Sequence, residues 1–389
     1  MSTRAPARTL GIIGSGQLGR MLAIAALPLG VQSRFLPRGD HTSVADFAGL
    51  VRPAGDDART AEPAFVRGLE VMTTEIEDVD AGTLARLAAH AARDGLACAL
   101  WPPAAAIACK RDRRGERTEL ARLGLPQGAW AATPDPADSD TAGERRAQLL
   151  AAIERVGMPC RVKAAIGGYD GRGQWLITTL ADVERVALAA APFVVEAEIA
   201  FDEEFSLLGV FAGDGSPPRC WTPTVNRHAD GILVRSEVAP ARLPLALQLV
   251  AERILGTLGQ ALGYRGVLAI ELYRIGNDVL INEFAPRVHN SGHWTIEGAA
   301  CSQFENHVRA VLGLPLGDTR LLAPCVSWNV LGAWPDRAAL LQVPGLHVHD
   351  YAKSPRPGRK LGHVTLWDAQ SEDGRAHAVQ ALLATPAAR

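Results

Sequence analysis

The sequence lacks the features of secreted and membrane-spanning proteins. Its six cysteines are scattered, with no Cys-x-x-Cys spacing, and aromatic residues make up only 5% of the chain. This cysteine pattern argues against a disulfide framework and a structural zinc site, and favours a reducing compartment. No apolar run approaches the roughly 20 residues of a membrane span, and residues 1–8 do not resemble a signal peptide. We therefore predict a cytoplasmic protein.

An excess of positive charge is also missing. The 389 residues contain 40 Lys and Arg against 42 Asp and Glu, a net charge of −2, so the chain has no overall basic field. Nucleic acid and membranes are therefore not predicted partners. The length suits two or three domains, and the Ala-, Leu- and Val-rich composition is typical of α/β proteins.

The first hundred residues alternate strand-like and helix-like segments. Strands are predicted at 9–13, 31–36 and 69–75 and helices at 20–27 and 81–93, a pattern typical of a parallel sheet. Gly14, Gly16 and Gly19 form a G-x-G-x-x-G loop after the first strand, as in dinucleotide-binding proteins. The second strand has no acidic residue at its end to hold a ribose, which disfavours nicotinamide. The helix start can still bind another anion.

A small lobe is predicted over about 129–193, after a charged helix at 110–122. It contains a helix at 144–156, strands at 160–164 and 174–178, and a helix at 180–190. Residues 167–174 carry four glycines within seven positions, which favours a flexible hairpin able to fold over phosphates. Lys163, on the preceding strand, could reach such a phosphate. The alternative is a tight surface hairpin with an ordinary exposed lysine.

Residues 194–199 have the form of a hinge strand with one open backbone edge, which could pair with an adenine. Glu204 follows and could accept hydrogen bonds from ribose hydroxyls, although a surface acid is the simpler interpretation. A long helix is predicted at 243–262, and His228 lies in a polar turn before it.

The most informative segment is 280–295, where a short strand runs into a polar cluster. Glu271 ends one apolar run and Glu283 ends the next, which predicts two short antiparallel strands with both acids in one cleft. Burying such a cluster is unfavourable unless it faces a ligand or metal, and Mg²⁺ prefers carboxylate oxygens shared with phosphates. The alternative is a pair of unrelated surface acids.

The C-terminal part is predicted to be a compact tail with strands at 323–331 and 347–351. After the second of these strands, residues 351–360 form a proline-containing loop with Lys353, Arg359 and Lys360. Arg and Lys suit a phosphomonoester, so the loop is predicted to bind one. The alternative is a run of solvated charges with no ligand.

Together these motifs resemble the N5-carboxyaminoimidazole ribonucleotide synthetase family, ATP-grasp enzymes of purine biosynthesis. The most specific matches are at 14–21, 167–174, 282–295, 302–305 and 359–365, and the likeness runs from Gly14 to about Thr365. The resemblance implies an α/β chain with an ATP-grasp fold. The predicted division is a Rossmann-like N-terminal domain (1–109), a small glycine-loop lobe (110–193) and a C-terminal α+β core with a phosphate-binding subdomain (194–389).

The resemblance also implies an activity. An ATP-dependent carbon-nitrogen ligase would join bicarbonate to 5-aminoimidazole ribonucleotide, releasing ADP and phosphate, with carboxyphosphate or CO₂ passing between the two substrates. ATP and Mg²⁺ are the expected cofactors, the other partners are small molecules, and a homodimer is expected. Runner-up hypotheses are a ligase with another acceptor, such as formate-dependent glycinamide ribonucleotide transformylase, a nicotinamide dehydrogenase, and a silent nucleotide sensor.

The resemblance assigns residues to each ligand. Glu271 and Glu283 would bind the metal, and Arg287 and His289 would hold bicarbonate and carboxyphosphate, with Lys163 at the transferred phosphoryl group. His289 is also considered as the acceptor for the amine. ATP would contact Arg113, Lys163, Gly167, Gly168, Tyr169, Asp170, Gly171, Arg172, Gly173, Gln174, Glu196, Ala197, Glu198, Ile199, Glu204, His228, Asn282 and Glu283. The ribonucleotide would contact Gln17, Leu18, Glu75, Tyr169, Asp170, Arg287, Asn290, Ser291, Lys353, Arg359 and Lys360.

Two departures from the family pattern remove charges near the reacting phosphate. The strand after Glu204 ends at Phe211 where the family usually carries an arginine, and Val225 stands where a glutamate is common. Neither change removes a predicted metal ligand, Lys163 or the glycine loop.

Overall fold

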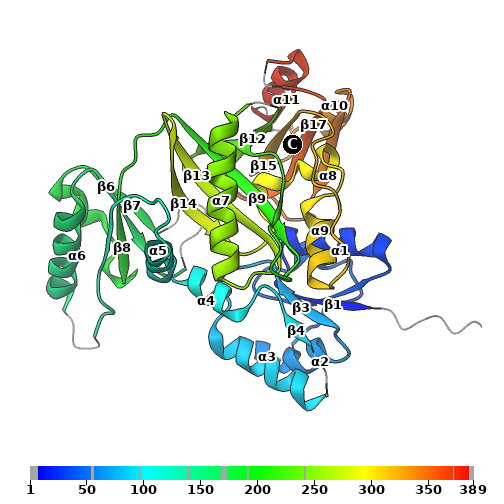
Figure 1. The fold of residues 1–389 in the computed structure, drawn as a ribbon, viewed down its shortest axis with the longest axis horizontal. Coiled ribbons are helices and arrows are strands. Elements are labelled where there is room, and N and C mark those ends of the chain that lie inside the picture. Colours follow the sequence, from blue (N-terminus) through cyan, green and yellow to red (C-terminus); the bar gives the residue numbers. More distant parts are fainter. Residues whose placement is uncertain are drawn as a thin grey trace, which may run out of the picture.

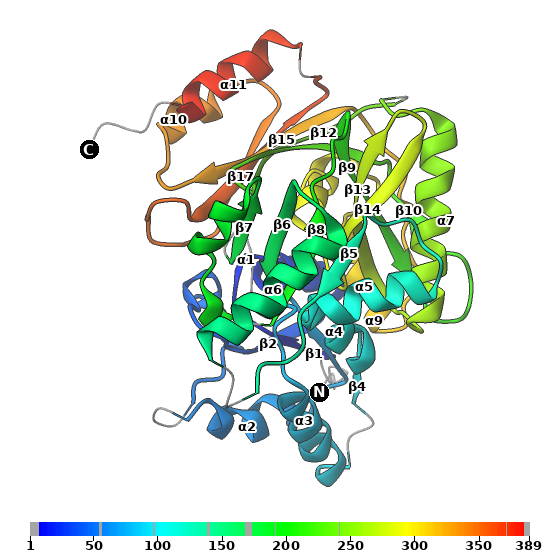
Figure 2. The same ribbon diagram turned by 90° about the vertical axis from the view of Figure 1, so that its left-hand side faces the viewer.

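The computed structural model describes residues 8–53, 57–95, 98–137, 141–167, 173–190, 192–240, 242–370 and 372–384. Its strands form three sheets, which belong to the N-terminal segment, the small lobe and the centre of the molecule. Figure 1 shows the small lobe standing apart on one side, and Figures 1 and 2 show the N-terminal sheet lying below the central one. Within the described ranges, no helix combines the length and apolar character needed to cross a bilayer.

The N-terminal sheet is parallel, in the order β2-β1-β3-β4, as the alternation of strands and helices predicts. Asp80 caps the helix α3 by accepting a hydrogen bond from the backbone N–H of Thr83 at 2.8 Å. The elements are β1 (Thr9–Ile13), α1 (Gln17–Ala26), η1 (Leu27–Leu29), β2 (Gln32–Leu36), η2 (Thr42–Val44), η3 (Ala58–Ala61), α2 (Glu62–Val66), β3 (Val71–Thr74), α3 (Ala81–Arg93) and β4 (Ala99–Leu100).

The small lobe is a four-stranded antiparallel sheet, in the order β5-β8-β6-β7, covered by α6. A capping box between Thr141 and Glu144 begins α6. The lobe and the helices before it comprise α4 (Ala104–Arg111), α5 (Arg113–Arg122), β5 (Trp130–Ala132), α6 (Ala142–Val156), β6 (Cys160–Ala164), β7 (Gln174–Ile177), η4 (Leu180–Arg185), η5 (Leu188–Ala190) and β8 (Phe193–Ala197).

The central sheet has nine strands and continues into the C-terminal tail, in the order β14-β13-β9-β11-β12-β15-β17-β16, with β10 beside β9. Its strands and helices are β9 (Glu203–Phe211), β10 (Arg219–Cys220), β11 (Thr224–Ala229), β12 (Ile232–Val238), α7 (Leu245–Ala261), β13 (Gly266–Ile275), β14 (Asp278–Ala285), η6 (Asn290–Gly292), α8 (Thr295–Gly298), α9 (Gln303–Val311), β15 (Cys325–Leu331), α10 (Arg337–Leu341), β16 (Leu346–Asp350), β17 (Lys360–Trp367) and α11 (Gly374–Ala384).

The two faces of the central sheet pack against different helices, because successive side chains of a strand point to opposite faces. On β13, Leu268 and Ile270 belong to the core cluster beneath α7, whereas Val267 and Ala269 pack with residues of α1 and α9. Figure 1 shows α7 lying across one face of the sheet. Glu271 follows Val267 and Ala269 by this alternation and therefore points away from α7.

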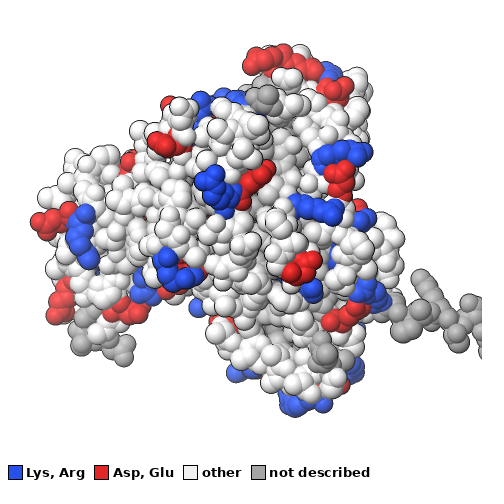
Figure 3. All heavy atoms as spheres, viewed as in Figure 1, with Lys and Arg blue, Asp and Glu red and all other residues white. Residues whose placement is uncertain are grey.

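The surface carries charges of both signs. On the face that Figure 3 shows, Lys and Arg side chains are interspersed with Asp and Glu among a majority of uncharged atoms. This distribution agrees with the net charge of −2.

Several predicted boundaries need correction. The predicted helix 110–122 is divided at Asp112, which has extended backbone angles and caps α5 through the N–H of Arg114. The predicted helix 180–190 is two 3₁₀ segments. The first segment ends at Arg185, because the following Val186 has extended backbone angles, and Val183 is the buried residue within it.

The predicted strands around the two acids are also longer than expected. β13 and β14 continue past Glu271 and Glu283, so both acids lie within strands rather than at their ends. The strands of the predicted compact tail, β15 and β16, join the central sheet together with β17, which was not predicted. The division into three domains at 109 and 193 stays a prediction.

Candidate active site

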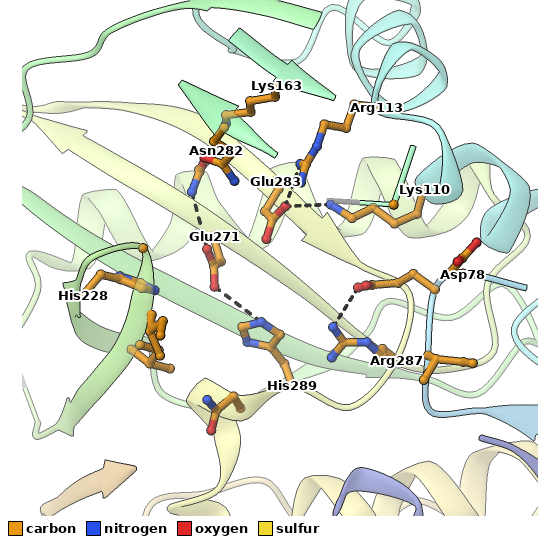
Figure 4. A pocket seen from close by; sticks show the side chains of 18 of the residues that line it. Asp78, Lys110, Arg113, Lys163, His228, Glu271, Asn282, Glu283, Arg287 and His289 are labelled. Atoms are coloured by element: carbon orange, nitrogen blue, oxygen red, sulfur yellow. Dashed lines mark hydrogen bonds and ion pairs between the residues drawn. The ribbon is translucent and has the colours of Figure 1, made fainter. Parts of the chain in front are cut away.

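One cavity of about 1040 Å³ collects residues from every part of the fold. Its walls come from the loop before α1, the helices α4 and α5, the small lobe, the central sheet and the loop after β16. Figure 4 shows one side of the cavity. Lys163 and Arg113 lie above the carboxylates of Glu271 and Glu283, and the imidazoles of His228 and His289 lie on the lower side. A pocket of this size is at the upper end of the range for small-molecule sites and leaves room for two ligands.

Strand pairing places the two expected metal ligands side by side. Glu271 on β13 is directly opposite Glu283 on β14, as expected for antiparallel neighbours. The register shifts after Glu271, so that Asn282 is an extra residue on β14. Such a bulge re-aims side chains, and Asn282 and Glu283 both line the cavity although they are consecutive.

The two carboxylates have opposite electrostatic surroundings. Burial raises the pKa of Glu271 to about 8, and the negative charge of Glu283 adds to this effect. Burial would also raise the pKa of Glu283, but the positive charges of Lys110 and Arg113 outweigh it and keep this pKa well below its usual range. The Oε2 atom of Glu283 lies 2.9 Å from Lys110 Nζ and 3.5 Å from an Arg113 nitrogen.

A second group of possible metal ligands surrounds Glu271. Ligand atoms of Glu204, His228 and Glu271 lie within 4.8 Å of one another, and no other such group of three occurs in the described part of the chain. The Nδ1 atom of His228 is 2.8 Å from a Glu204 oxygen. Asn282 donates weakly to both Glu204 and Glu271, at 3.3 and 3.4 Å.

Lys163 is part of a buried ion cluster at the hinge of the lobe. Its Nζ atom is 2.6 Å from Glu196, and Arg117 of α5 contacts the same carboxylate at 2.8 Å. Burial would raise the pKa of Glu196, but the charges of Lys163 and Arg117 lower it to about 2. The hinge strand β8 is a central strand, which corrects the expected open edge. The N–H groups of Ala197 and Glu198 bond to carbonyls of other segments.

The G-x-G-x-x-G loop holds a carboxylate of the protein itself. The backbone N–H groups of Gly16 and Gly19 donate to Glu75, the latter at 2.8 Å. A Cβ atom at Gly14 would lie 2.4 Å from Glu75 Cγ, and Gly14 has a φ of +115°. The glycines therefore make room for Glu75 where a dinucleotide-binding protein would place a phosphate.

The proline-containing loop approaches the N-terminal segment at the other end of the cavity. Lys353 Nζ donates to Gln17 Oε1, and Arg359 pairs with Asp40. Lys360 lines the same region. These cations come from a segment more than 300 residues after Gln17, so the cationic end of the cavity exists only in the folded chain.

Arg287 and His289 lie between the lobe end of the cavity and the end formed by the proline-containing loop. Arg287 contacts Glu77 at 2.8 Å, and the Nε2 atom of His289 is 3.4 Å from Glu271 Oε1. Burial, reinforced by the charge of Arg287, lowers the pKa of His289 to about 3, so its imidazole is neutral at physiological pH.

The structure brings most of the predicted site residues to one cavity. Those that line it are Gln17, Leu18, Glu75, Arg113, Lys163, Gly167, Gln174, Glu196, Ala197, Glu198, Ile199, Glu204, His228, Glu271, Asn282, Glu283, Arg287, His289, Asn290, Lys353, Arg359 and Lys360. Gly173 and Ser291 are described but do not line it. Ser291 is fully buried behind His289, which corrects its predicted contact with substrate. Gly168, Tyr169, Asp170, Gly171 and Arg172 lie outside the described residues.

Sequence reasoning missed several basic and acidic residues of the cavity. Lys110 of α4 and Arg117 of α5 line it with Arg113. Arg113 and Arg117 are four residues apart, which is the spacing of one helix face, so this pattern could have identified Arg117. Glu77 and Asp40 also line the cavity, but no local signal distinguishes them from surface acids.

Three family descriptions match successive parts of the chain. Residues 7–110 match the ribonucleotide synthetase preATP-grasp domain, residues 136–304 the ATP-grasp domain, and residues 325–377 the phosphoribosylaminoimidazole carboxylase C-terminal domain. Together they confirm the predicted ATP-grasp fold with a Rossmann-like domain before it.

Curated proteins and solved structures are similar over nearly the whole chain. The N5-carboxyaminoimidazole ribonucleotide synthase of Pseudomonas aeruginosa is 40% identical over 92% of this chain and 94% of its own length. That of Escherichia coli is 37% identical over 92% and 90%.

Among structures, the N5-carboxyaminoimidazole ribonucleotide synthetase of Thermus thermophilus has a TM-score of 0.85 at 38% identity, covering 97% of this chain and 99% of its own. The synthase of Aspergillus clavatus, in complex with ADP and 5-aminoimidazole ribonucleotide, has a TM-score of 0.83 at 26% identity and covers 97% and 98%. The predicted resemblance is thereby confirmed, and the chain belongs to the N5-carboxyaminoimidazole ribonucleotide synthase family.

Proposed function

We propose that this protein carboxylates 5-aminoimidazole ribonucleotide with bicarbonate at the expense of ATP, giving N5-carboxyaminoimidazole ribonucleotide, ADP and phosphate in purine biosynthesis. The observation that carries the proposal is a single cavity with a cationic region at each end and two paired carboxylates between them. Two phosphate-bearing substrates suit such a cavity. The Aspergillus clavatus relative, whose structure contains ADP and 5-aminoimidazole ribonucleotide, supports it.

We assign the lobe end to ATP and the loop end to the ribonucleotide. At the lobe end, Lys163, Arg113 and Lys110 provide positive charge beside Glu283. At the loop end, Lys353 and Arg359 would bind the phosphomonoester, since Lys offers a point charge and Arg a planar fork.

Glu271 and Glu283 suit a divalent cation such as Mg²⁺. The raised pKa of Glu271 reflects a buried carboxyl beside another negative charge, and a hard cation with oxygen ligands would relieve this repulsion. Glu283 already pairs with Lys110 and Arg113 through one oxygen, Oε2. When bound, the metal would neutralise phosphate charge on the nucleotide.

The remaining chemistry is positioning and charge stabilisation. Bicarbonate oxygen attacks the γ-phosphorus, the bond to ADP breaks, and Lys163 together with Arg113 stabilises the transferring phosphoryl group. The carboxyphosphate formed is destroyed by water, so the reaction with the amine must take place inside a closed site. The amine either attacks its carbon, which expels phosphate, or attacks the CO₂ left after phosphate has departed, and in both cases the nitrogen loses a proton to give the carbamate. Arg287 would bind the carboxylate as a bidentate donor, with His289 beside it.

A coupled assay of ADP release tests the proposal. We expect turnover only when ATP, bicarbonate and 5-aminoimidazole ribonucleotide are all present, with a carbamate carbon resonance arising from ¹³C-bicarbonate. ATP turnover that ignores omission of the ribonucleotide would contradict it. Formate with glycinamide ribonucleotide, offered in parallel, tests the alternative acceptor, which the similar proteins do not favour. The homodimer and the cytoplasmic location stay predictions.

A further inference from the structure

A buried chain of polar side chains leads from the middle of the central sheet to His289. Ser236 Oγ donates to Asn226 Oδ1 at 2.9 Å, and Asn226 Nδ2 donates to Ser206 Oγ at 3.1 Å. Ser206 Oγ donates to Ser291 Oγ at 2.7 Å, and this hydroxyl lies 2.9 Å from His289 Nδ1. All five residues are buried, and only His289 among them lines the cavity.

Strand register explains why these residues meet. Asn226 on β11 pairs with Ser236 on β12 and with Glu204 on β9, and Ser206 follows two residues later on the same face of β9. Ser206 is also opposite Glu271 on β13. The hydrogen-bonded side chains therefore lie directly beside Glu271 in the central sheet.

The donors along this chain have a defined direction. The amide nitrogen of Asn226 donates only, so Ser206 Oγ accepts from it, and Ser206 Oγ donates its own hydrogen to Ser291 Oγ. Ser291 Oγ then has its hydrogen left for His289 Nδ1. The backbone N–H of Ser291 points at the same Nδ1 atom at 3.4 Å and can only donate.

Two donors facing Nδ1 leave no room for a hydrogen on it. Because Nδ1 acts as an acceptor, the ring carries its hydrogen on Nε2, the atom that lies 3.4 Å from Glu271 Oε1. Gln303 fixes the backbone of the same residue, because its side chain accepts from His289 N at 2.8 Å and donates to His289 O at 2.6 Å. Both the ring and its backbone are therefore held from behind the site.

We propose that Asn226, Ser206 and Ser291 are positioning residues that hold His289 as the Nε2–H tautomer, so that it donates a hydrogen bond to an oxygen of the carboxyl group being transferred. In this state Nε2 has no lone pair for the amine proton, so His289 is not the acceptor for the amine. The inference rests on the proposed function for the identity of that carboxyl group, but the tautomer itself is a property of the free protein.

The first test is ¹⁵N–¹H correlation NMR of the free protein labelled at histidine, with the His289 signals identified by their loss in His289→Gln. We expect a protonated Nε2 and an unprotonated Nδ1 at neutral pH. A protonated Nδ1 would overturn the proposal. This measurement needs no substrate, so it stands even if the carboxylation assay fails, and failure of the proposed function is recognised separately by that assay.

The second test changes the direction of the chain. Asn226→Asp replaces the donating amide with an acceptor of the same shape, which should reverse the Ser206 and Ser291 hydroxyls and add the Nδ1–H tautomer to the spectrum. We expect kcat to fall about 10- to 100-fold, as for residues that orient a catalytic ligand, while the KM for ATP changes little. Ser206→Ala, which breaks the chain without adding charge, should act in the same direction and serves if Asn226→Asp does not fold.

Ser327→Ala is the matched control. Ser327 is also a buried strand serine of the central sheet and lies opposite Ser236, but its hydroxyl bonds to the Val364 carbonyl and the Thr365 hydroxyl, and it does not line the cavity. We expect its kcat and His289 spectrum to match the unmodified protein. Folded Asn226 and Ser206 variants that keep both the kcat and the tautomer unchanged would refute the positioning role.

Discussion

The ion cluster at the lobe hinge leads to a quantitative prediction for Glu196→Gln. Glu196 is the common partner of Lys163 and Arg117, both of which are buried. Its pKa is about 2 in the folded protein, against 4.5 for a free carboxyl. The gap between these values corresponds to about 3 kcal/mol of stability. Breaking a buried ion pair by removing one partner typically costs about 3–5 kcal/mol, which agrees.

The same pKa values predict how this contribution depends on pH. Because folding lowers the pKa of Glu196, its stabilisation is fully present above about pH 4.5 and is lost as the pH falls through about 2. Glu196→Gln should therefore destabilise the lobe by about 3 kcal/mol at pH 7 and by roughly half as much near pH 3.

Native-state hydrogen exchange of the β6 and β8 amides measures this free energy within the lobe. Glu184→Gln is the matched control, since Glu184 pairs with Arg146 on the surface of the same lobe and its side chain is 69% exposed. The control should show no measurable change. A loss below about 1 kcal/mol for Glu196→Gln, or a loss that stays constant down to pH 3, would refute the reasoning.

Three further predictions concern Lys163, Arg359 and Gly14. Lys163→Ala should weaken ATP binding and slow ADP release without unfolding the protein, and unchanged kinetics would remove Lys163 from the site. Arg359→Ala should raise the KM for the ribonucleotide more than that for ATP, and the reverse order in steady-state assays would mean that the phosphate site is misplaced. Gly14→Ala should lower the free energy of unfolding by about 2 kcal/mol or more, because it adds a clash with Glu75 to an unfavourable φ. Gly30→Ala, where φ is +70° and no atom lies near the added Cβ, should lower it less in parallel urea titrations.

Local patterns were sufficient for much of the fold. The predicted strands 9–13 and 160–164 and the helix 81–93 have the same bounds in β1, β6 and α3. Two neighbouring apolar runs, each ending in a carboxylate, also predicted the antiparallel pairing of Glu271 with Glu283. These features depend on residues that are close in sequence, where the pattern of apolar residues carries the information.

Other features could not be read locally. The hinge strand β8 became a central strand because β5, more than 60 residues earlier, pairs with it. Ser291 looked like a ligand contact, but its position beneath His289 depends on β9 and β11. Residues 180–190 were mistaken for one α-helix, although the backbone becomes extended at Val186, where this residue and Val183 pack into the core of the lobe.

The sequence alone determined the kinds of groups this protein brings to its site: two strand carboxylates, a lysine before a glycine-rich loop, an imidazole and a late cationic loop. Tertiary structure decided which of them face one another and in what protonation state. Glu75 occupies the start of helix α1, and Glu271 and Glu283 differ in pKa. The tautomer of His289 is set by side chains from three strands. The reason is physical, since burial and opposing charge act through space, between segments that the chain order keeps far apart.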